Sequence, residues 1–185
     1  MKGLFTTALE IACRAHKSQY DKQGKPYIMH VLRVAHGLDS TDEELMAIAV
    51  LHDTVEDGHE TYNSLEKAGM TARVIEGVRG LTHNPGVEYM DYIRAMRGKP
   101  DCLRVKRRDL LDNSNFLRLP GANEKDLSRM VKYILAFRMV EEMLRELEVL
   151  GYDATQWQIV GEEEVKAKAL SRAQDIMAER NDEQA

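Results

Sequence analysis

An uninterrupted apolar run that ends in four titratable residues is the feature that most constrains this chain. The run covers residues 45–51, and the residues that follow it include His52, Asp53, Glu56 and Asp57. A helix that is apolar on every side belongs in the core of a protein. An unpaired imidazole or carboxylate at its end is costly to desolvate. A divalent cation at the end of this helix would supply the missing partner, and a metal-dependent hydrolase is therefore indicated.

Hydrophobic spacing predicts helices along nearly the whole chain. Pro26 and a capping-box pattern at 41–44 mark two helix starts, and Gly151 ends the longest helix. The sequence has no convincing strand-like alternation. We therefore expect an all-α fold. The expected helices lie near residues 4–17, 26–38, 41–53, 61–68, 71–81, 88–97, 100–112, 123–149 and 162–179.

The length and composition indicate one ordinary globular domain. The 185 residues are 43% hydrophobic and 31% charged, and we expect a domain over 1–150 with a C-terminal helical extension of the same domain over 151–185. A net charge of -5 argues against nucleic acid as a partner, but a local basic patch still suits a small anionic substrate. Cys13 and Cys102 are interpreted as buried thiols in a reducing cytoplasm, and no segment suggests a membrane span or a signal peptide.

Two further metal ligands have to come from other helices. His30 lies in an apolar helical segment, and Asp109 is flanked by apolar residues at helical spacing. Hydrolytic metal centres combine neutral imidazoles with ionised carboxylates. The alternatives are a core histidine at position 30 and a plain salt bridge from Asp109 to Lys106 or Arg108. The other histidines are interpreted as structural or surface residues: His16, His36, His59 and His83.

Three ordered motifs resemble those of the HD-domain metal phosphohydrolases, whose pattern is H…HD…D. Residues 24–30 resemble G-x-P-Y-I-x-H, residues 51–57 resemble L-H-D-x-x-E-D, and residues 105–113 resemble I-K-x-x-D-x-x-x-N. These are motifs of the RelA/SpoT hydrolase domain and of the stand-alone small alarmone hydrolases. The resemblance extends over roughly residues 4–145.

This resemblance implies an HD-type hydrolase domain with a single Mn²⁺ ion. It implies hydrolysis of guanosine-3′,5′-bis(diphosphate) or its pentaphosphate, (p)ppGpp, to GDP or GTP plus pyrophosphate. The implied metal ligands are His30, His52, Asp53 and Asp109, with Glu56 and Asp57 as the acidic pair that activates water and with Lys22 and Asn113 on the substrate side. Solvated charges at Glu56, Asp57 and Lys22, and a helix cap at Asn113, are the alternatives.

Three positions depart from the family pattern. Asp21 replaces an arginine that packs on guanine, Asp112 replaces a histidine, and Gly58 replaces a threonine. An aspartate at position 21 weakens the inference to a guanine nucleotide. An HD-fold hydrolase of another phosphorylated nucleotide therefore stays open, as does a non-catalytic metal-bound nucleotide sensor. Nothing in the sequence argues for a particular oligomeric state.

Overall fold

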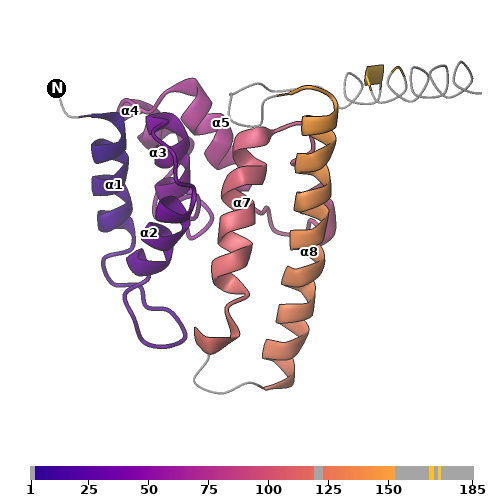
Figure 1. The fold of residues 1–185 in the computed structure, drawn as a ribbon. Helices are drawn as coiled ribbons and strands as arrows, with labels where there is room; N and C mark the ends of the chain where they lie inside the picture. The colour runs from indigo at the N-terminus through magenta and orange to yellow at the C-terminus, as the bar shows by residue number, and fades with distance from the viewer. Residues whose placement is uncertain (1–2, 119–122, 153–166, 169–170, 172–185) are drawn as a thin grey trace, which may run out of the picture.

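A computed structural model describes residues 3–118, 123–152, 167, 168 and 171 (Figure 1). The described residues are helical and otherwise irregular, apart from an isolated bridge between Tyr20 and Pro26. This result confirms the all-α prediction. The helices are α1 (Leu4–Ala15), α2 (Ile28–Gly37), α3 (Glu43–Leu51), α4 (Tyr62–Lys67), α5 (Ala72–Leu81), α6 (Tyr89–Arg94), α7 (Pro100–Asn113), the 3₁₀ turn η1 (Phe116–Arg118) and α8 (Glu124–Val149).

Helix α3 forms the centre of the core. It packs against α1, α2, α5 and α7, which surround it. Asp42 caps its N-terminus by accepting hydrogen bonds from the N–H groups of Glu44 and Leu45. Its last five residues, 47–51, are all buried. The C-terminal end of α3 therefore lies in the protein interior and not at the surface.

Helices α7 and α8 form the second half of the fold and lie side by side (Figure 1). Pro100 begins α7, and the side chain of Asn123 caps α8 by accepting from the N–H of Asp126. Because α7 also packs on α2 and α3, it carries residues of the second half to the end of α3. The helix expected at 162–179 and most of the extension expected at 151–185 lie outside the described residues.

One of the two cysteine interpretations was wrong. Cys102 is buried as expected, but Cys13 is exposed. On α1 the buried residues are Ala8, Ile11 and Ala12. Successive residues of a helix point about 100° apart, so the residue after Ala12 turns out of the interface with α3. Among the described residues, no helix is both long enough and apolar enough to cross a bilayer.

A close contact at Gly77 sets the spacing between α3 and α5. A Cβ atom at Gly77 would lie 2.5 Å from Cδ1 and 2.7 Å from Cγ1 of Ile48, which is fully buried. Real Cβ atoms do not approach carbon this closely. The absence of a side chain at Gly77 is therefore what allows the two helices to pack at this distance.

We predict that Gly77→Ala destabilises the protein. Overpacking of a core costs about 1–3 kcal/mol, and the better helix propensity of alanine returns about 1 kcal/mol at most. Urea denaturation should show a net loss of up to about 2 kcal/mol in the free energy of unfolding. Ile48→Val removes the nearest carbon, so the double variant should be more stable than the sum of the two single effects. If the effects of the two substitutions on the free energy of unfolding simply add, the contact between Gly77 and Ile48 does not set the helix spacing.

Candidate metal centre and adjoining pocket

Four predicted ligands meet at the buried end of α3. His52 is the C-cap of α3 and Asp53 follows it, while His30 comes from α2 and Asp109 from α7. The Nε2 atom of His52 lies 3.0 Å from Asp53 Oδ2 and 3.9 Å from Asp109 Oδ1. The Nε2 atom of His30 lies 3.3 Å from Asp109 Oδ1 and 3.7 Å from Asp53 Oδ2. Side chains from three helices thus enclose one small space.

In the neutral form that binds a metal ion, both histidines present a lone pair to that space. His52 Nδ1 lies 2.8 Å from the carbonyl oxygen of Ala49, which only accepts, so Nδ1 carries the hydrogen. His30 Nδ1 lies 2.6 Å from the carboxylate of Asp112 and carries a hydrogen for the same reason. The two Nε2 atoms are buried and have no hydrogen-bond partner among the described residues. These are the tautomers that a metal ion requires.

The carboxylates of this centre are held in the ionised form. Burial raises the pKa of Asp109, but Lys106 and the neighbouring imidazoles hold it well below its usual range. Lys106 Nζ donates to Asp109 Oδ2 at 2.8 Å, and Asn113 Nδ2 donates to Oδ1 at 2.5 Å. The hydroxyl of Tyr27 donates to Asp53 Oδ2 at 2.5 Å. An ion between these groups would therefore meet carboxylates that are already charged and oriented.

Asp112 has a role that the sequence analysis did not predict. Its carboxylate holds His30 Nδ1 and accepts two hydrogen bonds from Arg33, at 2.6 and 3.1 Å. Burial raises its pKa, but His30 and Arg33 lower it to about 2. The same pairing matters for His30, because burial lowers its pKa but Asp109 and Asp112 raise it to about 9. A carboxylate that orients a ligating imidazole is a recurrent feature of metal centres.

The two members of the acidic pair have different surroundings. Glu56 Oε2 accepts a hydrogen bond from the backbone N–H of His83 at 2.8 Å, and burial together with the charge of Asp53 raises the pKa of Glu56. Asp57 Oδ2 accepts from Gln19 Nε2 at 2.7 Å, and Glu56 and Asp57 are both exposed residues. The structure therefore places Glu56 in the electrostatic field of the metal centre and Asp57 beside the end of α1.

A pocket of about 250 Å³ adjoins the metal centre. Its lining includes His30 together with the two predicted substrate residues, Lys22 and Asn113. Lys22 Nζ lies 3.5 Å from Asp126 Oδ1 and its side chain is largely exposed. The lining also includes Arg118, Arg129 and Tyr133, which were not predicted from the sequence. Cations, aromatic rings and a candidate metal ligand thus line one cavity.

Asp21 does not present a free negative charge to this pocket. Its Oδ1 accepts from the N–H groups of Gln23 and Lys25, both at 2.9 Å, and so closes the loop before α2. Its Oδ2 lies 3.1 Å from the guanidinium of Arg118. Burial raises the pKa of Asp21, but the Lys25 N–H and Arg118 lower it below the usual value. A guanidinium therefore lies beside the position where the family pattern has its arginine.

The HD-domain profile matches residues 8–101, which is just over half of the 185-residue chain. The chain belongs to the HD-domain family. The match includes His30, His52 and Asp53 but ends before Asp109. The helical fold and the candidate metal centre described above agree with this assignment.

Several relatives carry the name of a (p)ppGpp-metabolising protein. A guanosine-3′,5′-bis(diphosphate) 3′-pyrophosphohydrolase of Aquifex aeolicus is 36% identical over 119 residues, covering 60% of this chain and 17% of the relative. The corresponding enzyme MESH1 of Danio rerio is 41% identical over 78 residues, covering 38% and 43%. A solved structure, titled as a metazoan ortholog of SpoT that hydrolyses ppGpp, superposes with a TM-score of 0.64 at 27% identity and covers 78% of this chain and 87% of that chain. The chain spans less than half the length of these two curated relatives.

We predict that His52→Ala removes the tightest metal-binding event of the protein. The substitution deletes one of few ligands, and without the ion Asp53 lacks a cationic partner among the described lysines and arginines, while Asp109 keeps only Lys106. Titration of metal-free protein with Mn²⁺, followed by calorimetry, measures the effect. His36→Ala is the matched control, because His36 is exposed on α2. Equal tight binding by wild type and His52→Ala would place the ion elsewhere.

Proposed function

We propose that this protein is a Mn²⁺-dependent (p)ppGpp 3′-pyrophosphohydrolase. The observation that carries the proposal is the shared wall between the pocket and the metal centre: His30 belongs to both. An anionic substrate held in the pocket would thereby have a phosphate within reach of the ligand cluster. The named activities of the relatives support the choice of a nucleotide pyrophosphate.

The ligand set is suited to a hard or borderline divalent cation. Two imidazoles and two carboxylates, His30, His52, Asp53 and Asp109, are compatible with Mn²⁺ and also with neighbouring transition metals. A bound ion would lower the pKa of a coordinated water and neutralise charge on the phosphate. Lys106, Asn113 and Asp112 would keep the ligands oriented.

Glu56 is the group that we assign to proton transfer. A raised pKa brings a carboxylate nearer to the operating pH, where a general base works best. The hydrogen bond from His83 N–H fixes one oxygen of Glu56, and the other oxygen stays available to accept a proton. Asp57 stays a prediction as the second member of the acidic pair, and Gln19 holds one of its two carboxylate oxygens.

The pocket offers groups for each part of the nucleotide. Lys22, Arg118 and Arg129 would neutralise phosphates, and Tyr27 and Tyr133 present rings on which a base can stack. Asn113 donates to Asp109, so its main proposed role is to orient this metal ligand. Contact with the substrate is its second proposed role. Phosphoryl transfer depends mainly on such positioning and charge neutralisation.

One observation favours a second candidate, a hydrolase that acts on a different phosphorylated nucleotide. Arg118 is tied to both Asp21 and Asp112, so it is less free to stack on guanine than an arginine in the preceding loop would be. Comparison of kcat/KM for ppGpp and its adenine counterpart distinguishes the two candidates. A clear preference for the adenine nucleotide would overturn the guanine proposal. Metal binding without turnover of any nucleotide would instead indicate a sensor.

We predict that Glu56→Gln retains the metal but loses most turnover. An amide cannot accept the proton of the attacking water, and general-base catalysis contributes about 10²–10⁴-fold. Release of pyrophosphate from ppGpp, measured with Mn²⁺ in excess, should fall by this factor in kcat. Glu76→Gln, on the exposed face of α5, is the matched control and should be unaffected. A near-normal kcat in Glu56→Gln would rule Glu56 out as the base.

Lys22→Ala should weaken substrate binding more than it slows the chemical step. Loss of a charge-assisted phosphate contact costs about 1–2 kcal/mol, or ~5- to 30-fold in KM. The side chain of Lys22 is 61% exposed and has a long ion pair, so the fold should tolerate its removal. Steady-state kinetics on ppGpp gives KM and kcat separately, with the exposed Lys17→Ala as control. An unchanged KM would show that Lys22 is a solvated loop residue that does not contact the substrate.

A further inference from the structure

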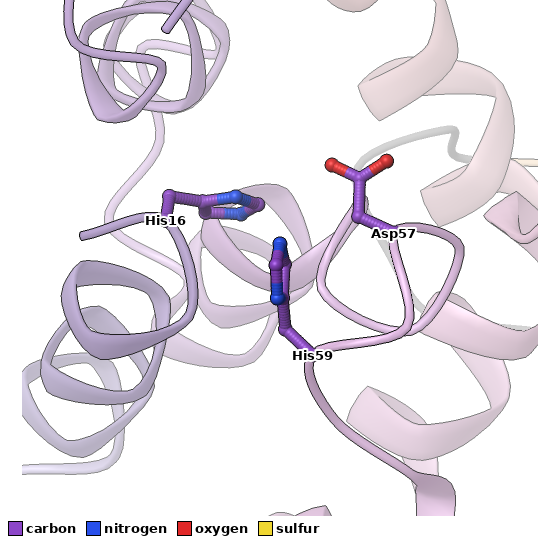
Figure 2. A group of neighbouring side chains, drawn as sticks. All are labelled: His16, Asp57 and His59. Atoms are coloured by element: carbon purple, nitrogen blue, oxygen red, sulfur yellow. The ribbon is translucent and has the colours of Figure 1, made fainter. Parts of the chain in front are cut away.

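A second group of ligand atoms lies beside the metal centre. His16 follows the last residue of α1, and Asp57 and His59 lie on the loop after α3 (Figure 2). One ligand atom from each of these three side chains lies within 4.8 Å of the others. None of the three is among the four ligands assigned above to the first centre, although the sequence analysis placed Asp57 in the acidic pair.

The hydrogen bonds of Gln19 fix the tautomer of His16. A carboxylate only accepts, so the group of Gln19 that lies 2.7 Å from Asp57 Oδ2 has to be its NH₂. The carbonyl oxygen of Gln19 therefore faces His16 Nδ1, at 2.6 Å. Because that oxygen also only accepts, Nδ1 carries the hydrogen. The lone pair of His16 is consequently on Nε2, the nitrogen suited to bind a metal ion.

This lone pair is buried and has no partner. His16 is 1% exposed, and its Nε2 atom has no hydrogen-bond partner among the described residues. Its ring packs against Tyr27, with centroids 5.1 Å apart, and meets His59 in an edge-on arrangement at 5.7 Å. Buried polar atoms are rarely left unsatisfied, and each exception needs an explanation. A ligand at Nε2 would provide it.

The loop geometry brings His59 to this point. Gly58 has a φ angle of +75°, in the left-handed region where a β-branched residue such as threonine is strained. The carbonyl oxygen of Thr54 then accepts hydrogen bonds from the N–H groups of both His59 and Glu60, at 3.1 and 3.0 Å. The replacement of the family threonine by Gly58 therefore permits a tight turn that places His59 next to His16.

We propose that His16, Asp57 and His59 bind a second divalent cation of the zinc class, with water completing its coordination. Two imidazoles and a carboxylate are a common ligand set for this ion. Gln19 acts as an outer-sphere residue for two of the ligands at once, because it holds His16 Nδ1 and Asp57 Oδ2. Asp57 Oδ1 is left to face the ion.

The site has to contract when the ion binds. Ligand atoms around tetrahedral zinc lie roughly 3.3 Å apart, which follows from bond lengths near 2.0 Å, and this is less than the 4.8 Å limit met here. Asp57 and His59 are exposed on a loop, so they are the members that can move toward the fixed imidazole of His16. With Asp57 engaged in this way, Glu56 remains as the carboxylate that serves the first centre.

The test is a count of bound zinc in untagged protein. Metal-free protein is dialysed against Zn²⁺, and the bound metal is measured by mass spectrometry. Wild type should hold two equivalents, and His59→Ala should hold one. His52→Ala should also hold one, because it loses the first centre and keeps the second. The double variant should hold none, and His36→Ala, with another exposed histidine removed, should hold two.

Asp57→Ala provides an independent second variant and should lose the same single equivalent as His59→Ala. Both residues are exposed, so the folded state should persist, and thermal unfolding without metal checks this. A single equivalent in the wild type, or two equivalents in His59→Ala, would overturn the proposal. The readout uses no nucleotide, so its failure leaves the proposed hydrolase activity standing, and failure of that activity leaves the metal count standing.

Discussion

The buried C-terminal end of α3 is the constraint on which the rest of the structure depends. A helix that is buried along its whole last turn delivers His52 and Asp53 into the core, where each needs a polar partner. Helices α2 and α7 supply those partners and cannot shift far from α3 without exposing them. Lys106 balances part of the negative charge, but the two Nε2 lone pairs are satisfied by no described protein group. The end of α3 thus brings together two imidazoles and two carboxylates in a set that suits a cation.

The departures from the family pattern at 21 and 112 form one connected unit. Arg118 contacts both aspartates, and Asp112 in turn holds the imidazole of His30. The Arg118 guanidinium therefore offsets part of the negative charge of two carboxylates that would otherwise repel an anionic nucleotide. Arg33 adds a second cation on Asp112. The guanidinium next to position 21 thus comes from a residue nearly one hundred positions later in the chain.

Local sequence patterns predicted the described helices and singled out the four candidate metal ligands, whose role stays a prediction, and they did so for physical reasons. Caps and hydrophobic spacing act within a few residues, and the apolar run before His52 signalled its burial directly. The roles of Asp112, Arg118 and His16 depend on contacts between elements far apart in the chain, which spacing does not encode. The prediction that Cys13 is buried was wrong, because a shift of one position along a helix turns a side chain from the core to solvent. The extension after residue 150 lies mostly outside the described residues.

The short turn after α3 explains why Glu56 and Asp57 have different surroundings. The family resemblance implies that both carboxylates act at one ion, but α3 ends at Leu51, before either of them. The chain continues in turns, in which the N–H of Asp57 binds Asp53 O and the N–H of Gly58 binds Val55 O. Consecutive side chains therefore diverge, with Glu56 held by His83 and Asp57 held by Gln19. One turn thus contributes to two neighbouring clusters, and Tyr27, which contacts both His16 and Asp53, connects them.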